Sequence, residues 1–181
     1  MNIVQPIRDQ EKIEEFKQAL LAKSDRDYMI FVTGINTGFR CGDMIKLKVK
    51  DVRGRDYINR VEQKTNKQRR LKITPSLKRE FKKYTAAMDD DDFLFQSRVG
   101  KNKPLSRTQV YNILRAAARE IGIEEVGSHT MRKTFGYWFY KKYKDVALLQ
   151  DLFNHASPAI TLRYIGINQD ERDRALDNFK I

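Results

Sequence analysis

Apolar side chains recur at helical spacing along most of the chain, and this pattern predicts a mainly α-helical protein. Residues 11–22 place four apolar side chains on one helical face, namely Ile13, Phe16, Leu20 and Leu21. The clearest amphipathic helix follows Ser106, and its apolar positions are Val110, Ile113, Leu114, Ala117, Ala118 and Ile121. Faces of this kind are buried against other elements, so they predict a packed helical core.

Local signals predict where several helices begin. Ser24 and Ser106 each stand three residues before an acidic or amide side chain, as in a capping box, and Thr74 precedes a proline at a first helical position. The helix after Ser24 is expected to be a buried element that ends at the turn 37–39, and another helix is expected to start at Arg40. Gly122 is a plausible stop for the helix after Ser106.

The C-terminal third predicts three consecutive helices. Ser128 is expected to cap a helix that runs from near His129 to about residue 143, with a core stripe formed by Phe135, Trp138 and Phe139. Gly136 lacks a side chain on the face of His129 and Arg132, which allows a close approach there. A short helix is expected over 145–153 and ends at Asn154, a residue that tolerates the left-handed conformation. It therefore presents His155 on a tight turn, and Ser157 and Pro158 open the next helix, with Tyr164 about two turns in.

The pattern changes between residues 49 and 73, where short segments rich in β-forming residues are separated by turn residues. These segments predict three antiparallel strands joined by two turns. The fold class is therefore α+β and mainly α-helical, with a small three-stranded antiparallel sheet near residues 49–73. At 181 residues we expect one domain, with its core at about 10–166. The tail, 167–181, is expected to form a helix that docks on its own domain or on a neighbour.

Charge and composition narrow the class of partner. Lysine and arginine total 36 against 24 aspartates and glutamates, a formal net charge of +12. Such an excess favours a polyanion, most plausibly nucleic acid, although a solvated basic surface has the same composition. The single cysteine, Cys41, excludes an internal disulfide and a cysteine-based zinc site. The apolar runs are too short for a membrane span, so a soluble, cytoplasmic protein is expected.

Candidate chemistry gathers in the C-terminal third. His129 and Arg132 stand three apart on one expected helix, His155 follows a second helix, and Tyr164 lies in a third. With Arg40 and Lys64 upstream they form a phosphate-handling set with a nucleophile. Each residue alone has a structural reading: a histidine at a helix start or in a turn, an arginine paired with a carboxylate, a tyrosine in the core. A helix that begins at His129 also offers free N–H groups to a phosphate.

Other charged residues suggest supporting roles. Asp43 lies three residues after Arg40 and can hold its guanidinium in place, or form an ordinary surface ion pair. The candidate DNA contacts, in the second turn, the basic loop before residue 105 and two helix starts, are Lys67, Arg69, Arg70, Lys101, Lys103, Arg107 and Lys133. The run of aspartates at 89–92 resembles a metal site, but contiguous carboxylates point in different directions and are typical of a solvated loop. No metal site is expected.

The motifs together resemble the tyrosine recombinase, or phage integrase, family of site-specific DNA recombinases, over about residues 26–166. The similar segments are Thr37-Gly38-Phe39-Arg40-x-x-Asp43, Gln63-Lys64-Thr65-x-Lys67, His129-Thr130-Met131-Arg132, and Asn154-His155 through Thr161-x-x-Tyr164. The departures are mild: methionine replaces leucine at 131, lysine a common histidine at 133, phenylalanine a leucine at 153, and asparagine a glycine at 154. A larger departure is the N-terminus. The family's helical core-binding domain is expected to be absent, which makes this chain a fragment or a minimal recombinase.

The resemblance implies that Tyr164 attacks a DNA phosphodiester, leaving a 3′-phosphotyrosyl link and a free 5′-hydroxyl. Arg40 and Arg132 would stabilise the negative charge that builds on the phosphate oxygens. His129 and His155 would bind the phosphate or help to move the tyrosine proton.

Lys64 would protonate the leaving 5′-oxygen. The phosphotyrosine conserves the bond energy, so neither ATP nor a metal cofactor is expected. The implied partner is double-stranded DNA, on which related recombinases assemble as tetramers. The free protein is expected to be a monomer.

Two other functions are compatible with the same residues. A type IB topoisomerase uses a similar arginine, lysine, histidine and tyrosine set to relax supercoils. A noncatalytic regulator that competes for a recombination site would keep the basic surface without the chemistry, although the intact residue set argues against it. Neither the DNA site nor the biological role, such as integration into or excision of a mobile element, is encoded in these motifs, because base readout depends on the bound geometry.

Overall fold

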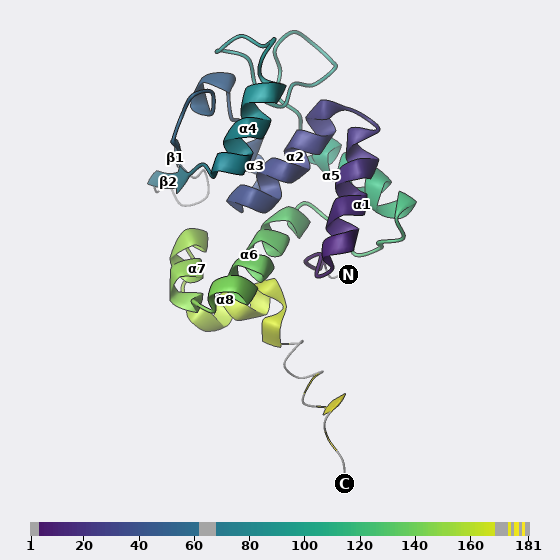
Figure 1. The fold of residues 1–181 in the computed structure, drawn as a ribbon, viewed down its shortest axis with the longest axis vertical. Helices are drawn as coiled ribbons and strands as arrows, with labels where there is room; N and C mark the ends of the chain where they lie inside the picture. The colour runs from purple at the N-terminus through teal and green to yellow at the C-terminus, as the bar shows by residue number, and fades with distance from the viewer. Residues whose placement is uncertain (1–3, 62–67, 169–173, 175, 178, 180–181) are drawn as a thin grey trace.

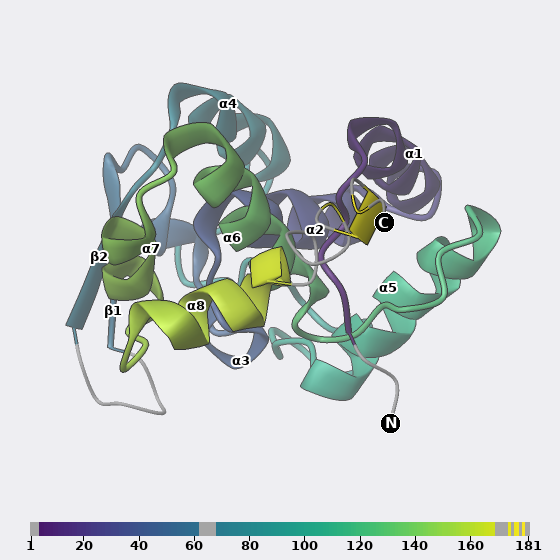
Figure 2. The same ribbon diagram turned by 90° about the horizontal axis from the view of Figure 1, so that it is seen from below.

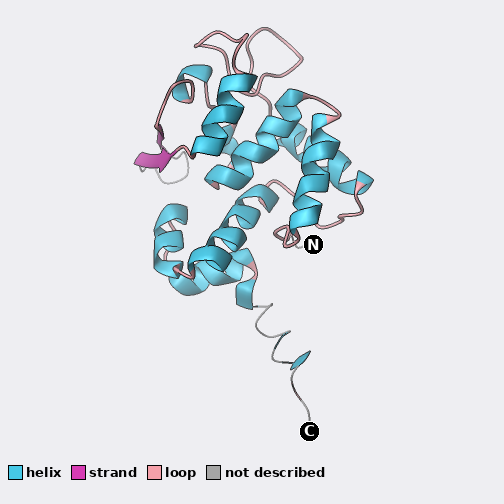
Figure 3. Ribbon diagram, viewed as in Figure 1, coloured by secondary structure: helices cyan, strands magenta, loops and turns pink. Residues whose placement is uncertain are grey.

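The computed structural model describes residues 4–61, 68–168, 174, 176–177 and 179. Its elements follow the order α1 (Gln10–Leu21), α2 (Asp25–Thr37), α3 (Cys41–Met44), the 3-10 helix η1 (Val49–Asp51), β1 (Tyr57–Val61), β2 (Gln68–Lys72), α4 (Pro75–Tyr84), α5 (Arg107–Glu120), α6 (Thr130–Tyr143), α7 (Val146–Phe153) and α8 (Pro158–Ile165). Helices dominate the fold, and the strands form a small hairpin at one side (Figures 1 and 3). The predicted fold class, mainly helical α+β, is confirmed.

Most of the predicted helix starts are confirmed by side-chain caps. The hydroxyls of Ser24, Thr74, Ser106 and Ser157 each accept a hydrogen bond from a backbone N–H of the first helical turn. The prediction for Ser128 is wrong, because His129 is the residue that precedes α6 and its side chain makes no cap bond. A turn takes the place of that cap: the Gly127 N–H donates to Thr130 Oγ1 at 2.9 Å, and the Thr130 N–H donates to the Gly127 carbonyl at 3.1 Å.

The sheet in the described residues has two strands, not three. β1 and β2 pair antiparallel in the register Ile58 to Leu71 and Arg60 to Arg69. The first predicted strand instead begins with η1. The Val49 N–H donates to the Asp92 carbonyl at 2.9 Å and the Lys50 N–H to the Asp90 carbonyl at 3.0 Å, so this segment is held by the aspartate loop. Its backbone donors are therefore unavailable to a third strand.

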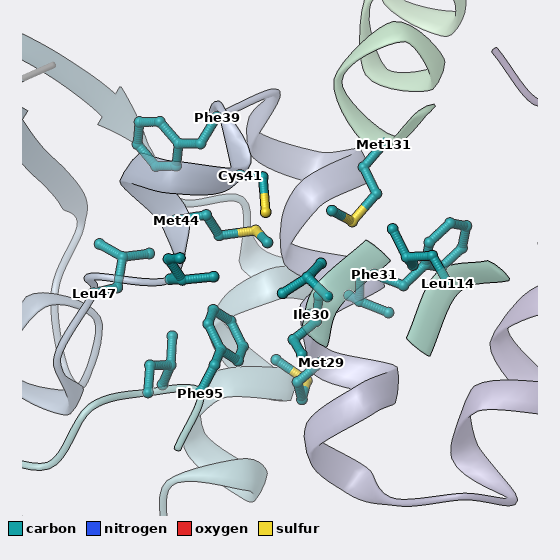
Figure 4. Close-up of a cluster of buried hydrophobic side chains, with 14 of the residues drawn as sticks. Met29, Ile30, Phe31, Phe39, Cys41, Met44, Leu47, Phe95, Leu114 and Met131 are labelled. Atoms are coloured by element: carbon teal, nitrogen blue, oxygen red, sulfur yellow. The ribbon is translucent and has the colours of Figure 1, made fainter. Parts of the chain in front are cut away.

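The buried apolar residues form two clusters. The larger one joins the helices α1 to α5, the hairpin and Met131 of α6, and part of it is drawn in Figure 4. The rings of Phe16 and Phe31, which belong to this cluster, stack with centroids 4.5 Å apart. The smaller one lies between α6, α7 and α8 and contains Tyr137, Leu149, Phe153, Ile165 and Ile167. These three helices form one end of the molecule in Figure 1, beside α2 and α3 (Figure 2).

The predicted core stripe of α6 is partly wrong. Phe135, Trp138 and Phe139 are only partly buried at the edge of the smaller cluster, while Met131 and Tyr137 are buried. The cause is that α6 packs on both sides, with α2 on one side and α7 and α8 on the other. Its buried surface is therefore broader than a single stripe.

No helix of the described residues is long and apolar enough to cross a membrane.

Candidate active site

Ends of helices bring the candidate residues together. Arg40 directly precedes α3, His129 directly precedes α6, and His155 follows the left-handed residue Asn154 (φ 51°) that ends α7. Tyr164 lies in the last turn of α8.

Tyr164 contacts the rings of three neighbouring residues, two of which are candidates. Its hydroxyl lies 3.0 Å from Nδ1 of His129. Its ring makes edge contacts with the rings of His155 and Phe153, with centroids 5.1 and 5.7 Å away. Burial raises the pKa of the Tyr164 phenol, and the charges of Arg132 and Arg40 oppose that rise. Both guanidinium groups are therefore close enough to act on the phenol.

Arg132 joins the helices that form the site. It is 2% exposed, and its two terminal nitrogens donate to the carbonyls of Gly38, which ends α2, and Phe153, which ends α7. The guanidinium also lies over the Phe153 ring, 4.1 Å from the centroid. A planar group with several donors suits this position, because it satisfies two helix ends while its charge remains near Tyr164.

His155 is oriented by residues on both sides of its turn. Its Nδ1 lies 3.1 Å from Thr161 Oγ1, a buried hydroxyl of α8. Its backbone is held by Gln150: the His155 N–H donates to the Gln150 carbonyl, and Gln150 Nε2 donates to the His155 carbonyl, both at 3.1 Å. Gln150 was not among the residues predicted from sequence, and only its position four residues before the left-handed Asn154 could have indicated a role.

A pocket of about 440 Å³ lies next to His129 and is lined by Arg40, Cys41, Gly42, Asp43, Arg107, Ser128 and His129. Arg107 packs against the backbone of Gly42, where an added Cβ would lie 2.6 Å from its Nε. Burial raises the pKa of the Cys41 thiol to about 11, although the charge of Arg107 opposes the rise. The thiol is therefore neutral at neutral pH. The charged side chains that line the pocket include Arg40, Arg107 and Asp43.

Lys64 and the candidate DNA contacts other than Arg107 have different surroundings. Lys64 and Lys67 lie outside the described residues, as does the side chain of Arg69. Lys101 and Lys103 are exposed in the loop before α5, and the Arg70 guanidinium lies 3.7 Å from the Tyr57 ring centroid. Lys133 is half-buried and donates to the Val4 carbonyl at 2.8 Å.

The aspartate run forms ion pairs with nearby basic residues. Asp91 pairs with Lys50 at 2.6 Å and Asp90 with Arg53 at 2.9 Å. Within the described ranges, no group of three or more histidine, cysteine or acidic residues is arranged to hold a metal ion.

Comparisons of sequence identify relatives. The model of the "Phage integrase family" matches residues 8–171. A probable integrase/recombinase, YoeC of Bacillus subtilis (strain 168), is 53% identical over 170 residues, which cover 94% of this chain and 93% of that protein. Tyrosine recombinase XerA of Pyrococcus furiosus is 27% identical over 93% of this chain and 59% of its own length. The chain therefore spans nearly all of the first relative but only about three fifths of the second.

Solved structures share the fold. The crystal structure of XerA recombinase superimposes with a TM-score of 0.76 at 22% identity, over 99% of this chain and 66% of that one. XerH site-specific recombinase bound to a palindromic difH substrate gives 0.72 at 18% identity, over 98% and 54%. The fold is that of a tyrosine recombinase catalytic domain. Together with the family match, this means that the chain belongs to the phage integrase family and is a tyrosine recombinase, an enzyme of site-specific DNA recombination.

Proposed function

We propose that Tyr164 is the nucleophile with which this recombinase cuts and rejoins DNA. The observation that carries the proposal is the 3.0 Å contact between the Tyr164 hydroxyl and Nδ1 of His129, at a place where Arg132 and Arg40 both act on the phenol. An acceptor within hydrogen-bond reach of a hydroxyl and cations at the point of attack are the features that nucleophilic attack on a phosphate requires.

The steps balance without a cofactor. The Tyr164 oxygen forms a bond to phosphorus as its proton moves to unprotonated Nδ1 of His129, and the bond from phosphorus to the 5′-oxygen breaks. Lys64 donates a proton to that oxygen. Arg40 and Arg132 stabilise the charge on the non-bridging oxygens, and His155 donates a hydrogen bond to one of them. Attack by another 5′-hydroxyl on the phosphotyrosine reverses these steps and joins the strands.

Asp43 is proposed to orient Arg40. The Asp43 side chain is buried and lines the same pocket as Arg40. A buried carboxylate needs compensating partners. An ion pair with the Asp43 carboxylate would fix the direction of the Arg40 guanidinium. Equal cleavage and equal stability of Asp43→Ala and the parent would remove this role.

The proposed substrate is double-stranded DNA. The exposed lysines 101 and 103, together with Lys67, Arg69, Arg70 and Arg107, are proposed to contact its phosphates, in keeping with the net charge of +12. Among the solved structures of similar fold, XerH is bound to a difH substrate and lambda integrase forms a tetramer on a Holliday junction. We propose that this chain, a cytoplasmic monomer when free, likewise assembles as a tetramer on DNA.

The proposed single catalytic domain extends from residue 1 to 181. Its tail, 167–181, is proposed to dock on a neighbouring protomer in the tetramer, except for Ile167, which is buried in its own domain. Leu176 and Phe179 in this tail are 69% and 67% exposed, so burial against a neighbour would stabilise the contact. Equal assembly on cognate DNA after deletion of residues 169–181 would exclude this docking.

Covalent capture tests the proposed nucleophile. Sheared DNA from the host and its mobile elements is incubated with the parent or with Tyr164→Phe, denatured in SDS and searched for fragments attached to protein. Attachment that needs Tyr164 supports the proposal and identifies the cleaved sequence. Relaxation of supercoiled plasmid at no defined site would indicate a topoisomerase instead. Binding to verified cognate DNA without attachment, also in a longer native chain if one exists, would indicate a noncatalytic regulator.

A further inference from the structure

Residues 4–7, which precede α1, are hydrogen-bonded to side chains in the first turns of α6. The Ile7 N–H donates to Thr134 Oγ1 at 2.9 Å, and Trp138 Nε1 donates to the Ile7 carbonyl at 2.9 Å. Farther toward the N-terminus, Lys133 Nζ donates to the Val4 carbonyl at 2.8 Å. Three side chains on one side of α6 therefore hold residues 4–7 in place.

Lys133 connects this segment to Tyr164. Its Nζ lies 5.2 Å from the centroid of the Tyr164 ring while it is bonded to the Val4 carbonyl. The side chain is half-buried, so the amine is shielded from bulk water. Burial lowers the pKa of Lys133, and the charge of Arg8 lowers it further. The contacts with Val4 and Tyr164 direct the Lys133 amine toward the tyrosine. The sequence had instead suggested that Lys133 contacts DNA.

We propose that Lys133 is a positioning residue for Tyr164, which it holds by its ring and whose ionised form it favours. This inference rests on the proposed role of Tyr164 as nucleophile. An ammonium group over an aromatic ring is attracted to the electron-rich face. The attraction increases when the phenol loses its proton, because a full negative charge then faces the cation in a partly desolvated place. The Val4 carbonyl fixes the amine by accepting one of its three N–H donors.

The N-terminal segment thereby influences the nucleophile through Lys133. Residues 4–7 determine where the Lys133 amine lies, and the amine contacts the ring of Tyr164. The hydroxyl of the phenol contacts His129. Tyr164 is thus held at its ring by one residue of α6 and at its hydroxyl by the residue that precedes the same helix.

A titration without DNA tests the contact directly. Tyrosine is labelled with 13C at Cζ, the Tyr164 signal is assigned by its loss in Tyr164→Phe, and its pKa is compared in Lys133→Arg and Lys133→Met. The other groups facing the phenol, His129, His155, Arg132 and Arg40, are the same in both variants. Arginine stays charged while tyrosine titrates, so Lys133→Arg should have a Tyr164 pKa lower than Lys133→Met by roughly 0.4–1.5 units. Equal values would overturn the proposal.

Cleavage kinetics separate positioning from DNA binding. The probe is a nicked duplex that carries the sequence recovered by Tyr164-dependent capture. At saturating DNA, Lys133→Met should form the covalent product roughly two- to thirtyfold more slowly than the parent, the range that follows from the strength of such contacts. The DNA concentration at half-saturation should stay unchanged, and Lys133→Arg should restore most of the rate.

Matched controls exclude a general loss of structure. Lys142 lies over the Tyr143 ring at 5.3 Å near the end of α6, so Lys142→Met removes a similar contact away from the site and should leave the rate unchanged. Weaker DNA binding by Lys133→Met, with its salt slope reduced by about one and its saturated rate intact, would mean a phosphate contact and would refute positioning. If the parent forms no covalent product, the proposed function fails, and the titration still decides the role of Lys133.

Discussion

The Tyr164 hydroxyl lies 3.0 Å from Nδ1 of His129, although 35 residues separate the two in the chain. Because burial raises the pKa of Tyr164, the phenol is protonated at neutral pH and must lose its proton when it attacks. In the tautomer whose Nδ1 carries no proton, His129 gives the phenol proton a destination.

His129→Ala should therefore slow formation of the covalent product by roughly 10²- to 10⁴-fold, the usual contribution of a positioned base. Without the imidazole, the rate should follow the small fraction of phenolate and rise about tenfold per pH unit between pH 7 and 9. Single-turnover capture on nicked DNA measures both effects. His129 is exposed, so the thermal midpoint should hardly change. A pH-independent rate close to that of the parent would exclude the base role.

Arg132→Lys is expected to be far from conservative. The guanidinium donates to the carbonyls that end α2 and α7 and lies over Phe153, and one ammonium group cannot span both acceptors in a plane. We expect Arg132→Lys to lose about 1–3 kcal/mol of unfolding free energy together with most of the cleavage. Urea unfolding and covalent capture measure the two losses. Full stability with lost cleavage would show that the two carbonyl contacts are dispensable for the fold.

The helix starts and the order of the candidate residues could be predicted from sequence because the signals are local. Ser24, Thr74, Ser106 and Ser157 bind N–H groups only a few residues away. The left-handed conformation of Asn154, which places His155, also depends on adjacent residues. Once the helices are placed correctly, the sequence positions of His129, Arg132 and Tyr164 limit where these three side chains can lie relative to one another.

Apart from the cap at Ser128, which a local turn between Gly127 and Thr130 replaces, the errors occurred where distant residues decide the structure. The first predicted strand was wrong because the loop at residues 90–92 binds the backbone of Val49 and Lys50. The stripe of α6 was incomplete because helices pack on both of its sides. The contacts of Lys133 with Val4 and Tyr164 join residues 129 and 31 positions away. No local pattern encodes such pairings.

Alkaline pH should destabilise the fold through Tyr84. Burial raises the pKa of this phenol from 10.0 to about 12, and its hydroxyl donates to the Leu94 carbonyl at 2.8 Å. The folded state therefore keeps the proton more tightly than the unfolded state. The resulting stability, on the order of 2–3 kcal/mol, is present below pH 10 and is lost as the pH rises toward 12.

Tyr84→Phe should be about 1 kcal/mol less stable than the parent at pH 7, because it lacks the hydrogen bond, and should lose less stability between pH 10 and 12. Urea unfolding at a series of pH values compares the slopes. Cys41, whose pKa is raised from 9.0 to about 11, lowers the stability of both proteins above about pH 9. Parallel stability curves for the parent and Tyr84→Phe above pH 10 would contradict the prediction.

Gly136 allows α7 and α8 to approach α6, and its replacement by alanine tests whether that approach holds the site together. An added Cβ would lie 2.6 Å from Ile165 Cγ2 and 2.7 Å from Phe153 Cε2. Alanine normally stabilises a helix by about 1 kcal/mol relative to glycine, but here overpacking should dominate and destabilise the protein by about 1–3 kcal/mol. Since Phe153 precedes the turn that carries His155 and Ile165 follows Tyr164, the displacement should also slow covalent capture. Lys141→Ala, at an exposed position of the same helix, should change stability by less than about 0.5 kcal/mol. A more stable Gly136→Ala protein with full activity would mean that the helices are held by other contacts.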